Sequence, residues 1–346
     1  MNVGDPAAPV LSVRELRVWY GTERGPVRAV DGVSFDVRPG ETLGLVGESG
    51  CGKSTLGRGI LGLLPSGSAT DGSVRFHDRE LVGLRQSEMR AMRGAEMGLI
   101  FQEPMTRLDP LMRISEHFAE TLHAHEPDLS RQQIDSRSID TLRRMGIPPT
   151  RYRHYPHEFS GGMRQRIMIA LALVLQPAFV VADEPTTALD VLVEAQILAI
   201  LHDLKRNFDT ALLLITHNLG IVAEACERVA VMYAGKIVEE GDARQVFSEP
   251  AHPYTRELLR STISLSTTEL HYIPGAPPDL VDPPSGCSFH PRCPNAMQVC
   301  PRIDPVEVRT PMGERVSCWL HGPEPLIPPG GTAPLQRQEL ARADEA

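Results

Sequence analysis

The sequence predicts an α/β fold with a mostly parallel sheet at its core, and three observations support this prediction. Short apolar runs rich in Val, Ile and Leu alternate with helical patterns, as at Thr42–Val46, Phe179–Ala182 and Ala211–Ile215. From about residue 103 to 175, charge-mixed helical sequence replaces the strand signals, which predicts an inserted helical subdomain. After about residue 250 prolines become frequent and four cysteines follow, which predicts a small Pro/Cys-rich extension.

The remaining elements are predicted from the same periodicities. Leu11–Val18 and Val33–Val37 are expected strands, separated by a turn-rich stretch. A helix is expected from about Lys53, and another strand at Met97–Phe101. Val191–Asn207 has the apolar spacing of an amphipathic helix. No internal repeat is present in the sequence, so each chain is expected to hold one copy of its core.

Composition and charge narrow the function classes. The chain has 346 residues, of which 41% are hydrophobic, enough for one large core and a smaller one. A formal net charge of −9 argues against nucleic acid as a partner, because surfaces that bind nucleic acid are basic. No apolar run reaches the roughly 18 residues of a membrane helix. The acidic start, Met1–Pro9, lacks the pattern of a signal peptide, so we expect a cytosolic chain.

A glycine-rich loop lies between the predicted strand Thr42–Val46 and the helix that follows. It fits the P-loop pattern with these residues: Gly47, Glu48, Ser49, Gly50, Cys51, Gly52, Lys53, Ser54 and Thr55. Glycines let consecutive N–H groups curl around phosphate oxygens, and the helix dipole attracts the same oxygens. We expect Lys53 to contact the β- and γ-phosphates and Ser54 to bind Mg²⁺. The alternative, an ordinary glycine turn, is disfavoured by the strand–loop–helix context.

Two adjacent carboxylates end the apolar strand that begins at Phe179. Asp183 is expected to hold Mg²⁺, directly or through another ligand, as P-loop NTPases require. Glu184 is expected to polarise the attacking water as a general base. Either carboxylate alone is also consistent with a helix cap, but the P-loop favours the catalytic interpretation.

A third motif runs from Ser160 to Arg166 and resembles the signature motif of ABC proteins. The usual form has Leu before the Ser and Gln after the glycines, where this chain has Phe159 and Met163. The resemblance implies an α/β P-loop NTPase of the ABC type, with an antiparallel β subdomain and a helical signature subdomain. It also implies that this motif binds ATP held by another subunit, through Ser160, Gly161, Gly162, Met163 and Gln165. A flexible turn that caps a helix is the alternative.

The other elements of the ABC pattern follow in the expected order. Tyr20 resembles the aromatic residue that stacks on adenine, although a core aromatic is the alternative. Gln102 resembles the glutamine that reaches Mg²⁺ and water and contacts membrane partners. Asp190 lies in a segment that resembles the loop at the dimer interface, and His217 resembles the histidine at the γ-phosphate. The resemblance covers about residues 10 to 250.

The C-terminal region narrows the class of ABC protein. His252–Thr255, Ile273–Gly275 and Gly286–Pro294 resemble the extension of the oligopeptide/dipeptide (and nickel) importer ATPases. A proline-rich tail with incidental cysteines is the alternative. The single ATPase unit argues against a translation factor, and the short Ser54-to-Ser160 interval argues against a DNA-repair ATPase with a long coiled coil.

The expected domains are a flexible N-terminus at 1–9, a nucleotide-binding domain at 10–250 with its helical subdomain at about 103–175, an extension at 251–322 and a disordered tail at 323–346.

The resemblance therefore implies an ATPase subunit that drives peptide import; a nickel or other small-solute importer, and a soluble non-transport ATPase, are alternatives. The implied partners are a second ATPase subunit, identical or paralogous, two membrane permeases and, indirectly, an extracytoplasmic binding protein. The chain is expected at the cytoplasmic face of the cell membrane. Residues 102–112 are expected to line a groove for a permease helix, with a lid packed on its own domain as the alternative.

Four cysteines are clustered in the extension: Cys287, Cys293, Cys300 and Cys318. Their spacing contains neither the close pairs of zinc sites nor the common ferredoxin run, so it does not identify a metal. The family resemblance implies a [4Fe–4S] cluster; zinc and no metal are the alternatives. We expect a structural role, because these cysteines lie far in sequence from the ATP-binding motifs.

Overall fold

The computed structural model describes residues 8–101, 108–186, 209–262 and 271–323, together with 194–195, 197, 199, 327 and 330–335. The chain divides into two compact units. Unit 1 comprises Met1–Ser12, Asp36–Thr42 and Arg75–Ile215, and unit 2 comprises Val13–Phe35, Leu43–Val74 and Thr216–Ala346. None of the described helices is long and apolar enough to cross a membrane.

Three parallel strands form the sheet of unit 1, in the order β8-β7-β6. They are β6 (Met97–Ile100), β7 (Phe179–Asp183) and β8 (Ala211–Ile215), and every residue of β7 and β8 is buried. Complete burial explains why these strands are continuous apolar runs rather than alternating ones. The sequence-based predictions of β7 and β8 are confirmed, and the strand predicted at Met97–Phe101 ends one residue earlier.

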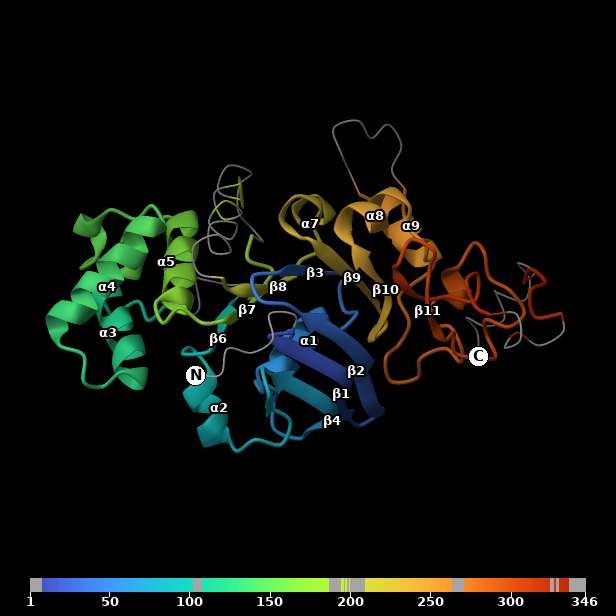
Figure 1. Ribbon diagram of the computed structural model, residues 1–346, viewed down its shortest axis with the longest axis horizontal. Helices are drawn as coiled ribbons and strands as arrows, with labels where there is room; N and C mark the ends of the chain where they lie inside the picture. Colours follow the sequence, from blue (N-terminus) through green and yellow to red (C-terminus); the bar gives the residue numbers. More distant parts are fainter. Residues whose placement is uncertain are drawn as a thin grey trace. The chain divides into compact units, whose positions relative to one another are not determined.

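The predicted helical subdomain is present in unit 1. Figure 1 shows its three main helices, which contact one another. They are α3 (Ile114–His125), α4 (Arg131–Arg144) and α5 (Gly161–Leu173). The Ser130 hydroxyl accepts a hydrogen bond from the Gln133 N–H and so caps α4. The smaller elements of unit 1 are β5 (Arg79–Glu80), α2 (Gln86–Met92) and the 3₁₀ turns η2 (Pro149–Arg151) and η3 (Pro156–Glu158).

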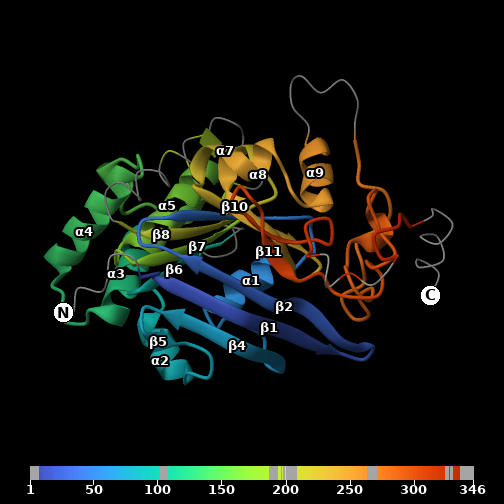
Figure 2. The ribbon, with the colours of Figure 1, turned by 45° about the vertical axis from the view of Figure 1, so that its right-hand side comes forward.

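Three long strands lie mostly in unit 2. Figure 2 shows β2 (Gly25–Val37), β1 (Leu11–Thr22) and β4 (Ser68–Phe76) side by side in this order. The turn-rich stretch predicted between Val18 and Val33 is wrong, because β1 continues to Thr22 and β2 begins at Gly25. In the part of β2 that the prediction missed, Ala29 and Val30 are buried in the core.

The second sheet of unit 2 has the order β11-β12-β10-β9-β3. β3 (Thr42–Val46) pairs in parallel with β9 (Arg228–Tyr233), and β10 (Lys236–Asp242) runs antiparallel to β9. The extension adds two edge strands, β12 (Arg315–Ser317) and β11 (Glu307–Arg309). The helices of unit 2 are α1 (Lys53–Ile60), α7 (Leu219–Ala225), α8 (Ala243–Ser248), α9 (Pro253–Arg260) and the 3₁₀ turn η4 (His290–Arg292).

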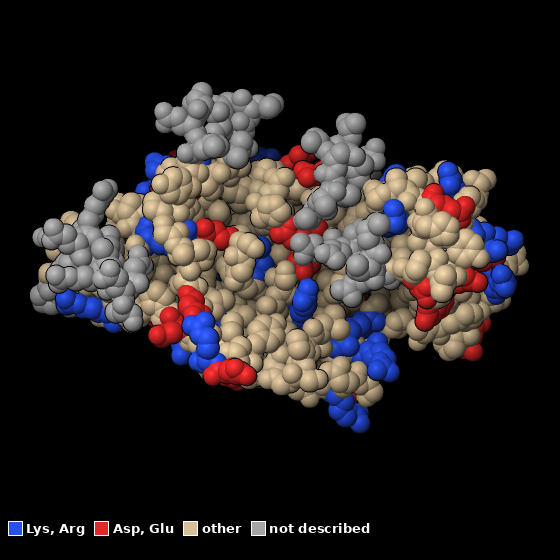
Figure 3. Space-filling model, turned by 180° about the vertical axis from the view of Figure 1, so that it is seen from behind, with Lys and Arg blue, Asp and Glu red and all other residues tan. Residues whose placement is uncertain are grey.

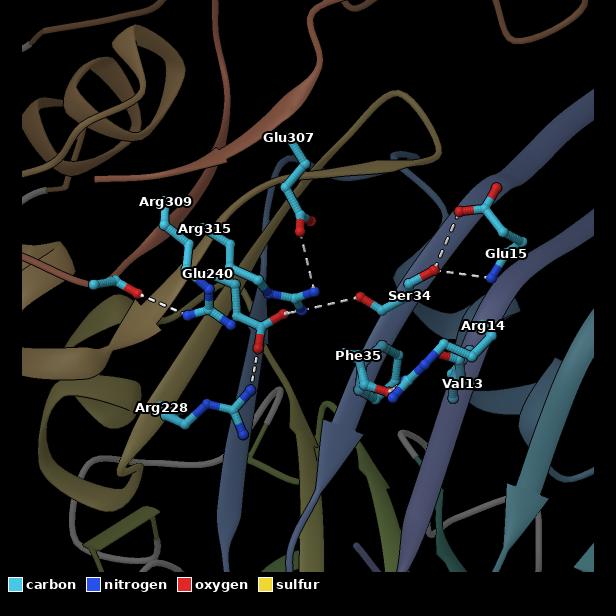
Figure 4. A network of polar contacts seen from close by, with 11 residues as sticks. Val13, Arg14, Glu15, Ser34, Phe35, Arg228, Glu240, Glu307, Arg309 and Arg315 are labelled. Carbon is cyan, nitrogen blue, oxygen red and sulfur yellow. Dashed lines mark hydrogen bonds and ion pairs between the residues drawn. The ribbon is translucent and has the colours of Figure 1, made fainter. Parts of the chain in front are cut away.

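A buried carboxylate joins the extension to this sheet. Glu240 on β10 lies between Arg228 and Arg315, to which it forms ion pairs (Figure 4). The Arg315 guanidinium also donates to the Ser34 carbonyl at 3.1 Å and lies 3.4 Å from Glu307. A buried carboxylate requires such partners, because an unpaired charge would cost several kcal/mol to bury. Charged side chains of both signs are interspersed on the face drawn in Figure 3.

Candidate functional site

The predicted P-loop lies in unit 2, directly after β3. Gly47, Gly50 and Gly52 have positive φ angles of 155°, 82° and 107°. The Lys53 ammonium is buried and donates to the carbonyls of Gly47 at 2.8 Å and Glu48 at 3.0 Å. Helix α1 begins at Lys53 and has no acidic residue in its first turn, so the positive end of its dipole is not offset by its own side chains. This geometry suits a bound anion.

Close backbone packing explains why glycine is needed in this loop. A Cβ at Gly52 would lie 1.9 Å from the Ala29 carbonyl oxygen, and one at Gly47 would lie 2.1 Å from the Met232 carbonyl oxygen. Distances this short are not tolerated by real side chains, and the contacts are with backbone that cannot rotate away. A Cβ at Gly50, in contrast, would meet no atom within 4 Å.

Two more of the predicted residues lie near the P-loop in unit 2. The Tyr20 hydroxyl donates to the Thr55 hydroxyl at 3.2 Å, and the ring is half-buried. The Thr216 N–H donates to the Leu45 carbonyl at 3.2 Å, two residues before Gly47. This bond brings the exposed His217, the next residue in the chain, to the same end of β3.

In unit 1, the two adjacent carboxylates lie at the end of β7. Asp183 is buried as the last residue of the strand. Glu184 is half-buried, and its N–H donates to the Ile215 carbonyl at 2.8 Å. Its φ angle of 52° is uncommon for a residue other than glycine, and such backbone strain clusters at functional sites.

The signature residues are also in unit 1, at the start of α5. Ser160 caps this helix, because its hydroxyl accepts from the Met163 N–H at 3.4 Å. Ser160 and Gly161 are exposed, whereas Gln165 is only 1% exposed. The Gln165 amide donates to the Pro185 carbonyl at 2.7 Å, so it supports the segment that follows Glu184. Gln102 and Asp190 lie outside the described residues.

Comparisons with known proteins agree with this arrangement. Residues 30–187 match the family model described as ABC transporter, and residues 238–300 match the one described as oligopeptide/dipeptide transporter, C-terminal region. The dipeptide transport ATP-binding protein DppD of Bacillus subtilis is 48% identical over 90% of this chain and 94% of its own length. The oligopeptide transport ATP-binding protein OppD of Salmonella typhimurium is 47% identical over 91% and 94%. This chain belongs to the ABC transporter family.

Solved structures of ABC cassettes share the fold. A dimeric ATP-binding cassette in a post-hydrolysis state with ADP and phosphate is 25% identical, with a TM-score of 0.60 over 68% of this chain and 99% of that one. CbiO1 of Clostridium perfringens is 27% identical, with a TM-score of 0.59 over 70% and 91%. The predicted α/β fold of the P-loop ABC type is confirmed, and as a member of this family the chain is an ATP hydrolase.

The four clustered cysteines of this ABC ATPase lie together in unit 2. All four are free thiols, and at least three of them are buried: Cys293, Cys300 and Cys318. Burial raises the pKa of every one of these thiols, to about 12 for Cys293 and about 11 for Cys318. Repulsion from the charge of neighbouring cysteines raises the pKa of Cys287, Cys293 and Cys318 further, so the thiols face a common region.

This cysteine region does not have the arrangement of a single-ion site. Among the described residues, no group of three or more His, Cys, Asp or Glu side chains is placed to hold a metal ion. The backbone of the region is tightly packed, because the Cys287 N–H donates to the Cys300 carbonyl at 2.8 Å. The same carbonyl oxygen lies 2.2 Å from the place where a Cβ at Gly286 would be.

Sequence reasoning missed two residues that contact the P-loop. Arg292, next to Cys293, forms an ion pair with Glu48 at 2.7 Å, and the Tyr254 hydroxyl accepts from the Glu48 N–H at 2.9 Å. The extension is therefore far from the ATP-binding motifs in sequence but contacts the P-loop in space. A lone Glu and a lone Arg, 244 residues apart, give no pairing signal in one sequence.

The contrast between Gly52 and Gly50 can be tested directly. Gly52→Ala is expected to abolish nucleotide binding, because its Cβ cannot be accommodated against the Ala29 carbonyl. Gly50→Ala is the matched control: it meets only the strain of a positive φ, about 1–2 kcal/mol, and should keep measurable binding. Titration of both variants with a fluorescent ATP analogue would compare them. Equal losses would contradict a role for close packing.

Proposed function

We propose that this chain is the ATP-hydrolysing subunit of a peptide importer. The observation that carries this proposal is that one chain joins an ABC core with a complete P-loop to the C-terminal region of oligopeptide/dipeptide transporters. The relatives in the comparison transport dipeptides and oligopeptides by name, which favours peptides over nickel as the solute. The proposal includes the division of the chain into a nucleotide-binding domain at residues 10–250 and a C-terminal extension at residues 251–322.

In this proposal, each side chain or loop of the site binds the part of ATP that suits its chemistry. Tyr20 stacks on the adenine, and Gly47–Thr55 cradle the phosphates with Lys53 as the counter-charge. The residues assigned to Mg²⁺ are Ser54, Gln102 and Asp183. Their hydroxyl, amide and carboxylate oxygens are ligands that suit this ion. Mg²⁺ held by these residues would supply positive charge that offsets the negative charge of the phosphates.

Hydrolysis is assigned to groups that hold or orient water and the γ-phosphate. Glu184 accepts a hydrogen bond from the attacking water and orients it, while His217 and Gln102 assist. Ser160, Gly161 and Gly162 bind the γ-phosphate of ATP on a second subunit, through a hydroxyl and the N–H groups at the start of α5. The exposure of Ser160 and Gly161 supports this role; Met163 and Gln165 act as supports, and Asp190 acts at the dimer interface.

The catalytic assignment is tested by Glu184→Gln. This change keeps the size of the side chain but removes the carboxylate, so ATP should still bind while hydrolysis falls by about 10²- to 10⁴-fold. Lys53→Ala should instead weaken ATP binding itself, because a charge that faces phosphate is lost. Paired measurements of nucleotide affinity and phosphate release distinguish the two effects. Near-normal hydrolysis by Glu184→Gln would refute the role of Glu184.

The proposed partners are a second ATPase subunit, two membrane permeases and an extracytoplasmic binding protein that acts through them, which places the chain at the cytoplasmic face of the membrane. Dimerisation of a related cassette supports the first of these. Within the segment 102–112, the 85% exposure of Leu111 supports a permease contact, whereas Leu108 is buried and packs in its own domain. The Asp109 carboxylate accepts from the Leu111 N–H at 2.9 Å and holds this turn.

Photo-crosslinking can test the permease contact. A photoreactive amino acid in place of Leu111 is expected to crosslink to a permease in the assembled transporter, because Leu111 is a large exposed apolar side chain in the proposed groove. The same substitution at Met312, which is 63% exposed in the extension, is the matched control and should give no permease adduct. Absence of adducts at Leu111 in an intact complex would contradict the proposed contact.

We also propose that Cys287, Cys293, Cys300 and Cys318 hold a [4Fe–4S] cluster. The support is that four cysteines of one short region form no disulfide and that three of them, Cys293, Cys300 and Cys318, are buried; cysteine sulfurs are the ligands of such clusters. A single zinc ion would need all its sulfur ligands at about 2.3 Å from one point. A four-iron cluster would take one cysteine ligand for each iron, and this region supplies four cysteines. Iron supplies the charge that favours the thiolates.

Iron content tests this cluster. Protein purified without oxygen should be brown and contain about four irons per chain. Cys300→Ser should remove the colour and destabilise the extension, because one ligand is lost. The matched control is Cys226→Ser, which changes a free cysteine outside the cluster and should keep both colour and iron. Colourless wild-type protein with stoichiometric zinc would refute the cluster.

A further inference from the structure

The P-loop of this chain carries a carboxylate of its own. Glu48 is the second residue of the loop, and its side chain is 23% exposed. Bound ATP would place several negative charges on the neighbouring glycines, so an unpaired carboxylate here would oppose binding. A freed carboxylate would also compete for Lys53, whose ammonium already lies 3.0 Å from the Glu48 carbonyl oxygen.

Arg292 of the extension neutralises this carboxylate. Its two terminal nitrogens donate to the two Glu48 carboxylate oxygens, at 2.7 and 3.0 Å, in a bidentate pair. The Arg292 side chain is 5% exposed, so water screens the pair weakly. Burial alone would lower the pKa of the guanidinium, but the hydrogen bonds to Glu48 and Tyr233 outweigh burial and raise it. Both groups are therefore charged and matched in geometry.

The Arg292 guanidinium is also fixed independently of Glu48. Its Nε donates to the Pro274 carbonyl at 2.9 Å, and its terminal nitrogens donate to the Ile273 carbonyl and the Tyr233 hydroxyl, both at 3.3 Å. With the two bonds to Glu48, all five of its N–H donors are used. The side chain thus presents a preformed fork to Glu48 and does not need to be ordered by it.

A second contact holds the backbone of the same P-loop residue. The Tyr254 hydroxyl accepts from the Glu48 N–H at 2.9 Å, and the Tyr254 ring is fully buried against Tyr233 and Phe289. His252 caps helix α9, which begins with this segment, through its ring nitrogen and the Tyr254 N–H at 3.0 Å. The extension therefore fixes both the N–H and the carboxylate of Glu48.

We propose that Arg292 is a positioning residue for ATP binding. By pairing with Glu48, it neutralises a negative charge on the phosphate-binding loop and restricts the motion of that loop. This inference rests on the proposed role of Gly47–Thr55 in ATP binding. The extension is then part of the nucleotide-binding apparatus, and its contribution is made through the second residue of the P-loop.

The inference is tested by Arg292→Met, which keeps the length of the side chain but removes its charge. The full-length protein is titrated with Mg-ATP and assayed for hydrolysis. We expect roughly tenfold weaker binding, with the loss in KM rather than in kcat, because an unpaired carboxylate then lies next to the phosphate-binding loop. The loss should shrink at high salt. Arg292→Lys should recover part of the affinity, because it restores the charge without the bidentate fork.

The double variant Glu48→Gln/Arg292→Met separates charge compensation from a merely structural role. If Arg292 acts by neutralising Glu48, removal of the carboxylate should restore most of the lost affinity. Arg24→Met is the matched control, since Arg24 forms an ion pair with Asp279 of the extension that is largely exposed, and this change should not alter affinity. Unchanged binding by Arg292→Met, or a double variant as weak as the single one, would overturn the inference.

Lys53→Ala distinguishes a failure of this inference from a failure of the proposed function. If Lys53→Ala loses ATP while Arg292→Met binds normally, only the role of Arg292 is refuted. If Lys53→Ala also binds normally, the P-loop assignment itself fails. Should Arg292→Met not fold, the comparison of Arg292→Lys with and without Glu48→Gln replaces it, and the same rescue is required.

Discussion

The parallel pairing of β3 with β9 is the constraint on which the rest of unit 2 depends. It aligns Val46, the last residue before the P-loop, with Val231 near the end of β9. The Met232 carbonyl then lies against Gly47, and Tyr233 follows at the position where Arg292 can reach it. Because β10 returns antiparallel to β9, the edge of the sheet is available to the two short strands of the extension. One strand pairing thus brings the loop and the extension together.

Arginine–carboxylate pairs make the attachment of the extension strong. Arg315 contacts Glu240 on β10, and Arg292 contacts Glu48 on the P-loop; in both cases the extension supplies the cation and the core supplies the carboxylate. Loss of one partner of a buried pair typically costs about 3–5 kcal/mol, because the other charge remains buried without compensation. Without the extension Glu48 would lose its ion pair, whereas Glu240 would keep Arg228, so Glu48 is the core carboxylate that depends on the extension.

The sequence predicted the elements whose signal is local. β3, β7 and β8 are short apolar runs, and the P-loop is a contiguous motif, so both could be predicted from adjacent residues. The strands β11 and β12 have three residues each, too few for a period to appear, and only the pairing of β12 with β10 and of β11 with β12 makes them strands. The contact between Glu48 and Arg292 depends on tertiary structure alone. The length of β1 was underestimated because its last four residues, Trp19–Thr22, include no buried residue that would continue the apolar alternation.

The cysteines and the P-loop are far apart in sequence but are linked in space through Arg292. Arg292 is the last residue of η4, directly before Cys293, and the His290 N–H at the start of η4 donates to the Cys287 carbonyl at 2.9 Å. The turn that carries Arg292 is therefore bounded on both sides by cysteines. Whatever holds the thiols at fixed positions also limits how far this turn can move relative to Glu48. The packing of this cysteine region therefore acts on the phosphate-binding loop through Arg292, beside the contact that Tyr254 makes with Glu48.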